Sequence, residues 1–290
     1  MGKLFIGMQY VLPQHTFSRV VLAATRIRLP LIKDALIGAF LKGFDPEMGD
    51  AVEPDAHAYP SFNAFFTRAL RPEARPIAAP PRALACPVDG TVSQAGPIAV
   101  DQLFQAKGHH YSLQALLGGA APAWAARFVD GLFATIYLAP YNYHRIHMPC
   151  DGTLADAWYV PGKLFSVNGQ TAAAVPGLFA RNERVVLLFE GEAGAFAVIL
   201  VGALFVGSMT TVWHGDVTPR RPRRPTQLPL TAERAPLTLS RGAELGRFNM
   251  GSTVVLLFGK DRATLAAQIN AGRVVRMGEA LGELSAAAPA

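Results

Sequence analysis

The chain has 290 residues, of which 51% are hydrophobic and 17% charged, and its formal net charge is +6. This length and composition predict one large or two small globular domains and exclude an intrinsically disordered protein. The positive charge favours an anionic partner. Because aromatic residues do not alternate with the basic ones, we expect a membrane surface and no nucleic acid. The two cysteines, Cys86 and Cys150, indicate neither a disulfide framework nor a zinc site, which predicts a reducing cytoplasm.

Residues 1–48 are expected to form amphipathic helices that associate with a membrane. After Pro30, apolar residues recur every four positions, as on one face of a helix: Ile32, Leu36, Phe40 and Phe44. The preceding segment, 17–29, carries three arginines and no acidic residue, a composition that suits a membrane interface. An ordinary helical pair packed on the core explains the same pattern equally well, so both interpretations stay open. No stretch of the sequence reaches the roughly 20 apolar residues that cross a bilayer.

Beyond Pro80 the sequence consists of short strand-like segments separated by glycine and proline turns. Two of these turn-and-strand segments, 87–92 and 149–154, resemble each other, as repeated units of an antiparallel sheet would. We therefore predict an α+β fold with an antiparallel, β-rich core, sandwich-like or barrel-like, and N-terminal amphipathic helices. The predicted division is a helical membrane-association segment, 1–48, and a catalytic domain, 49–290.

The segment 218–236 is rich in proline and arginine, and its prolines oppose regular structure. A solvated loop is the simpler interpretation. An anion-attracting surface beside a site or a bilayer is the alternative.

Three distant segments carry residues that could act together on a peptide bond. Asp89 lies in a turn, His144 and His147 lie three positions apart, and Gly251-Ser252 precedes a strand-like apolar run. A carboxylate that orients an imidazole, and an imidazole that takes a serine proton, make a nucleophile of that serine. Glycine leaves its carbonyl unshielded, so Ser252 could attack the bond that precedes it.

Each of these features also has a plain structural explanation. A turn aspartate is common, two histidines at this spacing are also typical of structural or metal-binding roles, and 207–208 is a second Gly-Ser pair. The residues alone leave the matter open. No third segment rich in metal ligands lies close in the sequence.

Together these segments resemble phosphatidylserine decarboxylase of the bacterial, membrane-associated proenzyme type. The resemblance runs through most of the chain, in 59–68 (YPSFNAFFTR), 87–90 (PVDG), 107–113 (KGHHYSL), 143–149 (YHRIHMP), 159–168 (YVPGKLFSVN), 179–184 (FARNER) and the Gly251-Ser252-Thr253 junction. Met250 departs from the leucine usual in the family, a swap that conserves volume and apolar character. The 218–236 segment does not resemble the family closely, so the resemblance implies no role for its residues.

The resemblance implies a self-processing precursor. Asp89, His147 and Ser252 would form the triad that cleaves the chain between Gly251 and Ser252 into fragments 1–251 and 252–290. Ser252 would become a pyruvoyl group, which forms a Schiff base with the substrate amine and acts as an electron sink, the role that pyridoxal phosphate has elsewhere. The implied reaction converts phosphatidylserine to phosphatidylethanolamine and carbon dioxide, without a metal.

The resemblance and the chemistry also suggest further roles. His144 is our candidate for the proton donor to the product carbon, because imidazole titrates near neutral pH. Ser166 and Asn168 are expected to bind the phosphodiester or carboxylate of the substrate. An anionic lipid substrate predicts a peripheral protein at the cytoplasmic face of the cell membrane. A homodimer is compatible with the sequence.

Three other functions compete with this one. A serine hydrolase could use Asp89, His147 and Ser252 without self-cleavage, although the G-x-S-x-G motif of the α/β hydrolases is absent. A non-catalytic peripheral membrane module would bind lipid without reaction. A pyruvoyl enzyme for a soluble amino acid is the third, and the basic N-terminus argues against it.

Overall fold

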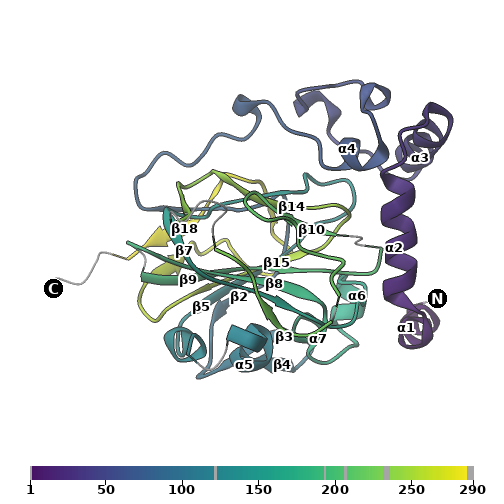
Figure 1. Cartoon of the computed structure of the whole chain (residues 1–290). Helices are drawn as coiled ribbons and strands as arrows, with labels where there is room; N and C mark the ends of the chain where they lie inside the picture. Colours follow the sequence, from purple (N-terminus) through teal and green to yellow (C-terminus); the bar gives the residue numbers. More distant parts are fainter. Residues whose placement is uncertain are drawn as a thin grey trace.

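An antiparallel nine-stranded sheet forms the centre of the molecule in the computed structural model, which describes residues 2–120, 123–192, 194–205, 208–221, 223–230 and 236–285 (Figure 1). Its strand order is β12-β7-β8-β9-β15-β5-β2-β17, and β13 also pairs with β7. The strands are β2 (Gly90–Pro97), β5 (Leu132–Tyr137), β7 (Gly152–Val160), β8 (Arg184–Gly191), β9 (Gly194–Val201), β12 (Thr226–Gln227), β13 (Thr238–Leu239), β15 (Thr253–Phe258) and β17 (Val274–Val275).

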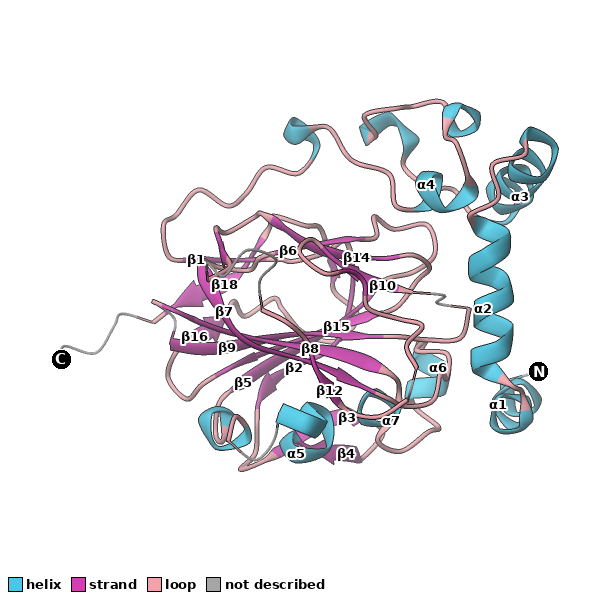
Figure 2. Ribbon diagram, viewed as in Figure 1, coloured by secondary structure: helices cyan, strands magenta, loops and turns pink. Residues whose placement is uncertain are grey.

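Smaller sheets accompany the large one, and two of them lie over one of its faces (Figure 2). The four-stranded sheet has the order β11-β10-β14-β6, the three-stranded sheet has the order β1-β18-β16, and β3 pairs with β4. Their strands are β1 (Ala83–Ala85), β3 (Gln102–Ala106), β4 (His109–Ser112), β6 (Arg145–His147), β10 (Met209–Thr211), β11 (Gly215–Asp216), β14 (Glu244–Phe248), β16 (Ala263–Leu265) and β18 (Ala280–Leu284). All pairings between these strands are antiparallel.

Helices gather at one end of the molecule and on the face of the large sheet away from the four-stranded and three-stranded sheets (Figures 1 and 2). The N-terminal helices α1, α2 and α3 stand at that end, and α5 lies with the β3-β4 hairpin below the sheet. The helices are α1 (Gly2–Val11), α2 (Gln14–Thr25), α3 (Pro30–Gly43), α4 (Phe62–Phe66), α5 (Leu113–Leu117), α6 (Gly169–Ala172) and α7 (Leu178–Arg181). Short 3-10 turns are η1 (Met48–Asp50), η2 (Ala56–Ala58), η3 (Pro72–Ala74), η4 (Gly118–Ala120) and η5 (Ala125–Phe128).

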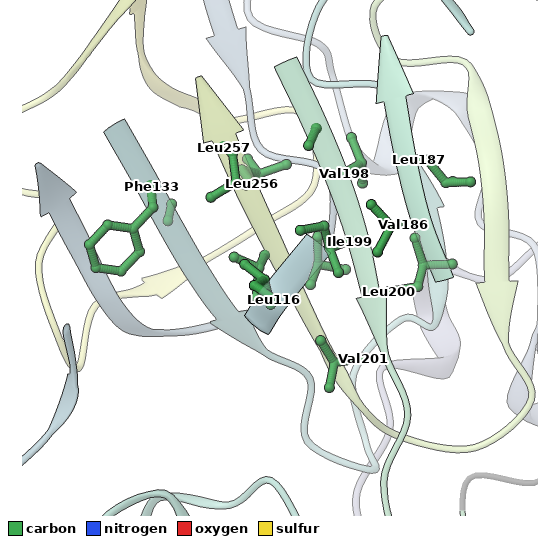
Figure 3. Close-up of a cluster of buried hydrophobic side chains, with 14 of the residues drawn as sticks. Leu116, Phe133, Val186, Leu187, Val198, Ile199, Leu200, Val201, Leu256 and Leu257 are labelled. Carbon is green, nitrogen blue, oxygen red and sulfur yellow. The ribbon is translucent and has the colours of Figure 1, made fainter. Parts of the chain in front are cut away.

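Strand β15 is central to the core. It pairs in register with β5 on one side and β9 on the other, from Thr253 opposite Tyr137 and Val201 to Phe258 at the far end. All six of its residues are buried, because each face of the strand packs against apolar side chains. A continuous apolar run is typical of a strand covered on both faces. Figure 3 shows Leu256 and Leu257 of this strand among side chains of β8 and β9.

The helices α1 and α2 face the protein with polar side chains and the solvent with apolar ones. In α2 the buried residues are Gln14, Ser18, Leu22 and Thr25. In α1, Gln9 is 1% exposed while its neighbour Met8 is 49% exposed. This polarity is the inverse of an ordinary surface helix, which buries its apolar stripe.

The expected apolar stripe on the third helix is only partly the buried face. Phe40 is buried, but Ile32 and Phe44 are exposed, and the residue of α3 that is completely buried is Ile37. The helix therefore packs on α4 through positions 37 and 40 and leaves the ends of the predicted stripe uncovered.

The predicted α+β class with an antiparallel, β-rich core is confirmed, and the sheets of the described residues are open rather than closed into a barrel. None of the described helices is both long and apolar enough to span a bilayer. The proline- and arginine-rich segment contributes β12, and Arg223 donates to the Gly162 carbonyl. Residues 222 and 231–235 of that segment, and Gly207 of the second Gly-Ser pair, lie outside the described residues.

Candidate active site

The Gly251-Ser252 junction lies where β14 ends and β15 begins. Ser252 is completely buried, and its hydroxyl has no hydrogen-bond partner among the described residues. Its carbonyl accepts the N–H of Leu138 at 2.9 Å, which fixes the start of β15 against the end of β5. Asn249, two positions before Gly251, is held by hydrogen bonds. The amide of Asn63 donates to its carbonyl and to its side-chain oxygen, and its own amide donates to the Thr210 hydroxyl. Ser208 and Thr253 also have buried hydroxyls without a partner in the described part of the chain, but Ser252 alone of these three directly follows Gly251, which lines a cavity.

His144 lies directly beside the junction. A methyl group placed on Gly251 would lie 3.4 Å from His144 Nε2. The other ring nitrogen, Nδ1, lies 2.8 Å from the carbonyl of Asn142, which can only accept, so Nδ1 carries the proton. The ring packs on Phe66, with 4.1 Å between the ring centroids. Nε2 is buried, has no hydrogen-bond partner in the described part of the chain, and offers a lone pair.

Burial keeps His144 neutral. It lowers the pKa of this imidazole to about 3, and the positive charge of Arg68 acts in the same direction. At neutral pH the ring therefore stays uncharged, with Nε2 able to accept a hydrogen bond and Nδ1 donating one to Asn142.

His147 lies on β6 with both ring nitrogens engaged. Nδ1 lies 2.8 Å from the Gly242 carbonyl, and Nε2 lies 3.0 Å from the hydroxyl of Tyr143, whose ring stacks on the imidazole. Burial lowers the pKa of His147, against the opposing effect of its bond to the Gly242 carbonyl. The backbone N–H of His147 donates to Pro87, so the segment that carries Asp89 runs beside this histidine.

Asp89 is bound by Arg75. The Nε of Arg75 donates to both carboxylate oxygens at 3.0 and 3.1 Å, and Nη2 donates to Oδ2 at 2.7 Å. The backbone N–H of Met277 adds a bond to Oδ1 at 2.8 Å. Among the described residues no hydrogen bond joins His147 to Asp89 or to Ser252.

A cavity of about 410 Å³ opens at the junction. Its walls come from the helices α2, α3 and α4, from the end of β5, from the 166–168 segment, and from the junction itself. The lining residues are Val21, Phe40, Phe44, Phe66, Tyr137, Leu138, Pro140, Ser166, Val167, Asn168, Ala203, Leu204, Phe205, Met250 and Gly251. Mostly apolar walls with a few polar groups are typical of a small-molecule or lipid site.

Both residues predicted to bind substrate lie on this cavity. Asn168 also caps α6, because its Oδ1 accepts the N–H of Thr171 at 2.9 Å. Its amide nitrogen is left to donate to an anion. In the described part of the chain no group of three His, Cys, Asp or Glu side chains is placed to hold a metal ion.

The structure thus places His144 beside the Gly251-Ser252 junction, and Ser166 and Asn168 line the same cavity as Gly251. Sequence reasoning did not single out Arg75, Tyr143 or Asn249. A buried arginine that pairs with an aspartate 14 positions away leaves no local signature in the sequence, whereas Tyr143 lay inside the quoted histidine segment.

Comparison with known proteins identifies the family of the chain. A family model described as phosphatidylserine decarboxylase matches residues 62–283, and a second model, described as PSD, matches residues 4–45. A phosphatidylserine decarboxylase proenzyme of Pseudomonas putida (strain GB-1) is 53% identical over 97% of this chain and 98% of its own length. Those of Pseudomonas entomophila (strain L48) and Pseudomonas aeruginosa (strain LESB58) are 53% and 52% identical, over 97% and 96% of both chains.

By these sequence matches the protein is a decarboxylase, that is, a carboxy-lyase. The chain belongs to the phosphatidylserine decarboxylase family, as the resemblance predicted. The serine hydrolase and the non-catalytic membrane module are not favoured.

Proposed function

We propose that this chain is a precursor that cleaves itself at Gly251-Ser252, and that the mature protein decarboxylates phosphatidylserine at a membrane surface. The single observation that carries the proposal is the buried, unpartnered hydroxyl of Ser252 next to a glycine that lines an apolar cavity. Ser252 fits the pyruvoyl group because conversion of its hydroxyl to a carbonyl breaks no hydrogen bond among the described residues.

Self-cleavage is an acyl shift followed by an elimination. The Ser252 hydroxyl loses its proton to a histidine, and its oxygen attacks the Gly251 carbonyl carbon. The C–N bond breaks, the nitrogen takes up a proton, and an ester replaces the amide. Loss of the Ser252 α-proton expels the Gly251 carboxylate, which ends fragment 1–251 and leaves dehydroalanine on fragment 252–290. Water then adds and ammonia leaves, giving the pyruvoyl group.

His147 with Asp89 is the proposed base for this step. The support is the family resemblance and the backbone bond from His147 to Pro87, which brings the Asp89 segment alongside. To receive the serine proton, His147 Nε2 must exchange its bond with the Tyr143 hydroxyl for one with Ser252. His144 is a second candidate, because its free Nε2 already lies at the junction.

In the mature protein the pyruvoyl group supplies a carbonyl that binds the substrate amine and withdraws electrons as carbon dioxide leaves. His144 is the proposed proton carrier. As a neutral base it takes a proton from the substrate ammonium when the amine binds, and as an acid it returns a proton to the α-carbon afterwards. Because burial holds the pKa of His144 well below neutral in the empty site, this role requires the charged substrate to raise that pKa when it binds.

Ser166 and Asn168 are proposed to bind the charged headgroup, and the apolar walls of the cavity to receive the glycerol and acyl ends. The cavity lies between the junction and the helices α2 and α3, so a lipid can enter from the side on which those helices lie. Only the serine end of the substrate needs to reach Ser252.

The segment 1–48 is proposed to bind the cytoplasmic face of the cell membrane without spanning it. Its support is the inverted polarity of α1 and α2, whose outer faces expose Val11 at 83% and Val20 at 62%. Apolar groups that face outward gain by entering the lipid interface. The net charge of +6 favours an anionic leaflet.

Intact-mass measurement of purified protein tests the proposal. We expect two fragments that meet at Gly251/Ser252, the smaller with a blocked N-terminus, and carbon dioxide release from phosphatidylserine vesicles but not from free serine. Ser252→Ala should stay at about the full mass of 31.0 kDa and release none. An active preparation that holds only the full-length chain would refute self-processing.

A further inference from the structure

Two glutamines from the N-terminal helices hold the backbone of one cavity wall. Gln9 Oε1 accepts the N–H of Ser166 at 2.7 Å, and Gln14 Oε1 accepts the N–H of Leu164 at 2.7 Å. The Gln14 amide nitrogen donates to the Gln9 carbonyl at 2.6 Å, so the two residues form one unit. Their exposed fractions are 1% and 4%.

The wall they hold is an extended segment, 163–168, that belongs to none of the described sheets. On its other side Asn182 Oδ1 accepts the N–H of Phe165 at 3.1 Å, and Asn182 Nδ2 donates to the Phe165 carbonyl at 2.8 Å. On that side the backbone also bonds at Lys163, to Arg181 and Glu183, whereas the bonds from the helices come from side-chain amides. A buried N–H that loses its acceptor is costly, so the glutamine bonds stabilise the position of the wall on the helix side.

The segment ends in the residues that face the substrate cavity. Ser166 and Asn168 line the same cavity as Gly251. The opposite faces of α1 and α2 are apolar and exposed, as Val11 and Val20 show. One pair of side chains thus connects the membrane-facing helices to the wall that meets the headgroup.

We propose that Gln9 and Gln14 are positioning residues for the substrate, which hold Ser166 and Asn168 at the cavity wall from the membrane-associated helices. The inference rests on the proposed function. It adds that the helices shape the site as well as bring it to the membrane, so that removing the glutamine bonds weakens substrate binding even where no membrane is present.

Gln9 gives a clean test because its amide nitrogen has no partner in the described part of the chain. Gln9→Met removes the acceptor that Ser166 uses, at similar side-chain length, and breaks no other hydrogen bond of the Gln9 side chain within the described residues. Ser18→Ala is the matched control. Ser18 is buried on the same side of α2 as Gln14, and its hydroxyl has no partner among the described residues. Each variant is assayed for the cleaved fraction, for vesicle binding, and for kcat and KM.

The decisive substrate is short-chain phosphatidylserine used below its micelle concentration. For Gln9→Met we expect KM to rise about ten-fold, with kcat and the cleaved fraction within about two-fold of the starting protein. Ser18→Ala should stay near the starting KM. An unchanged KM for Gln9→Met with the soluble substrate, or a rise that appears only with vesicles, overturns the inference. The starting protein tests the proposed function separately, because it must cleave and release carbon dioxide in the same assay.

Discussion

Arg75 donates hydrogen bonds from Nε and Nη2 to the carboxylate of Asp89, at distances of 2.7 to 3.1 Å, and both side chains are buried. Met277 binds the same carboxylate through its backbone N–H. Arg75 belongs to the fragment before the cleavage site and Met277 to the fragment after it. Asp89 therefore ties the two proposed fragments together, and Arg75 fixes the orientation of its carboxylate.

Replacing Arg75 with methionine should destabilise the precursor strongly. It leaves the Asp89 carboxylate buried without a cation, which typically costs about 3–5 kcal/mol. Urea unfolding of the uncleaved Ser252→Ala protein, with and without the change, measures the loss. Arg127→Met is the control, because its partner Glu190 is 44% exposed and such pairs contribute at most about 1 kcal/mol. Equal losses for the two variants would contradict the special role of the buried pair.

The two histidines should separate the two reactions. We expect His147→Gln to remain uncleaved, since the proposed base is gone. His144→Gln should cleave and then decarboxylate at least about 100-fold more slowly, the usual scale of proton-transfer catalysis. Intact mass reports cleavage, and carbon dioxide release reports turnover. The reverse pattern, with cleavage lost in His144→Gln alone, would make His144 the base for maturation.

The pH dependence of stability should reveal the buried neutral imidazole of His144. Its pKa in the folded chain is about 3, against 6.5 for an ordinary histidine, so the unfolded chain binds more protons between these values. Stability is therefore complete above about pH 6.5 and falls as the pH drops, by up to about 1.4 kcal/mol per pH unit. From pH 7 to pH 5 the Ser252→Ala protein should lose about 2 kcal/mol more than Ser252→Ala/His144→Gln. Parallel curves for the two proteins would refute the buried, neutral state.

Asn168→Asp should impair substrate binding and leave the fold intact. Aspartate caps a helix as well as asparagine does, so α6 keeps its N-terminal bond. The new carboxylate faces an anionic headgroup in the cavity, and we expect KM to rise at least about ten-fold. Asn270→Asp adds the same charge at an exposed position that does not line this cavity and should leave KM unchanged. A normal KM for Asn168→Asp would remove Asn168 from the headgroup site.

Membrane binding should depend on the outward apolar residues of α1 and α2. The double change Val11→Ser/Val20→Ser removes apolar surface that enters the interface, and should weaken binding to anionic vesicles about ten-fold. Self-cleavage should proceed normally, since neither side chain lines the cavity. Val100→Ser is a control of similar exposure, 67%, in the turn between β2 and β3. Vesicle sedimentation that fails to distinguish the two proteins would contradict a membrane-facing role for these helices.

The apolar run of β15 was predictable because a strand buried on both faces leaves a continuous pattern in the sequence. The inverted helices were harder to interpret. The usual assumption is that a helix buries its apolar residues. It gives no reason to expect that Gln9 and Gln14 lie on the buried sides of α1 and α2. Residue types also could not distinguish His144 from His147, since both lie in one segment. Arg75 was not predicted because it contacts Asp89, 14 positions away, only in the folded chain.

Strand β15 has a consequence for how the protein is made. The Gly251-Ser252 bond lies beside His144 and the cavity only when β15 is already inserted between β5 and β9. Under the proposed self-processing, the pyruvoyl group can therefore form only in a chain that has folded correctly. The proposed cleavage would also remove the link between β14 and the central strand, so a mature molecule that unfolds would lack the covalent connection with which it first folded. The proposed maturation would thus act as an irreversible check on folding.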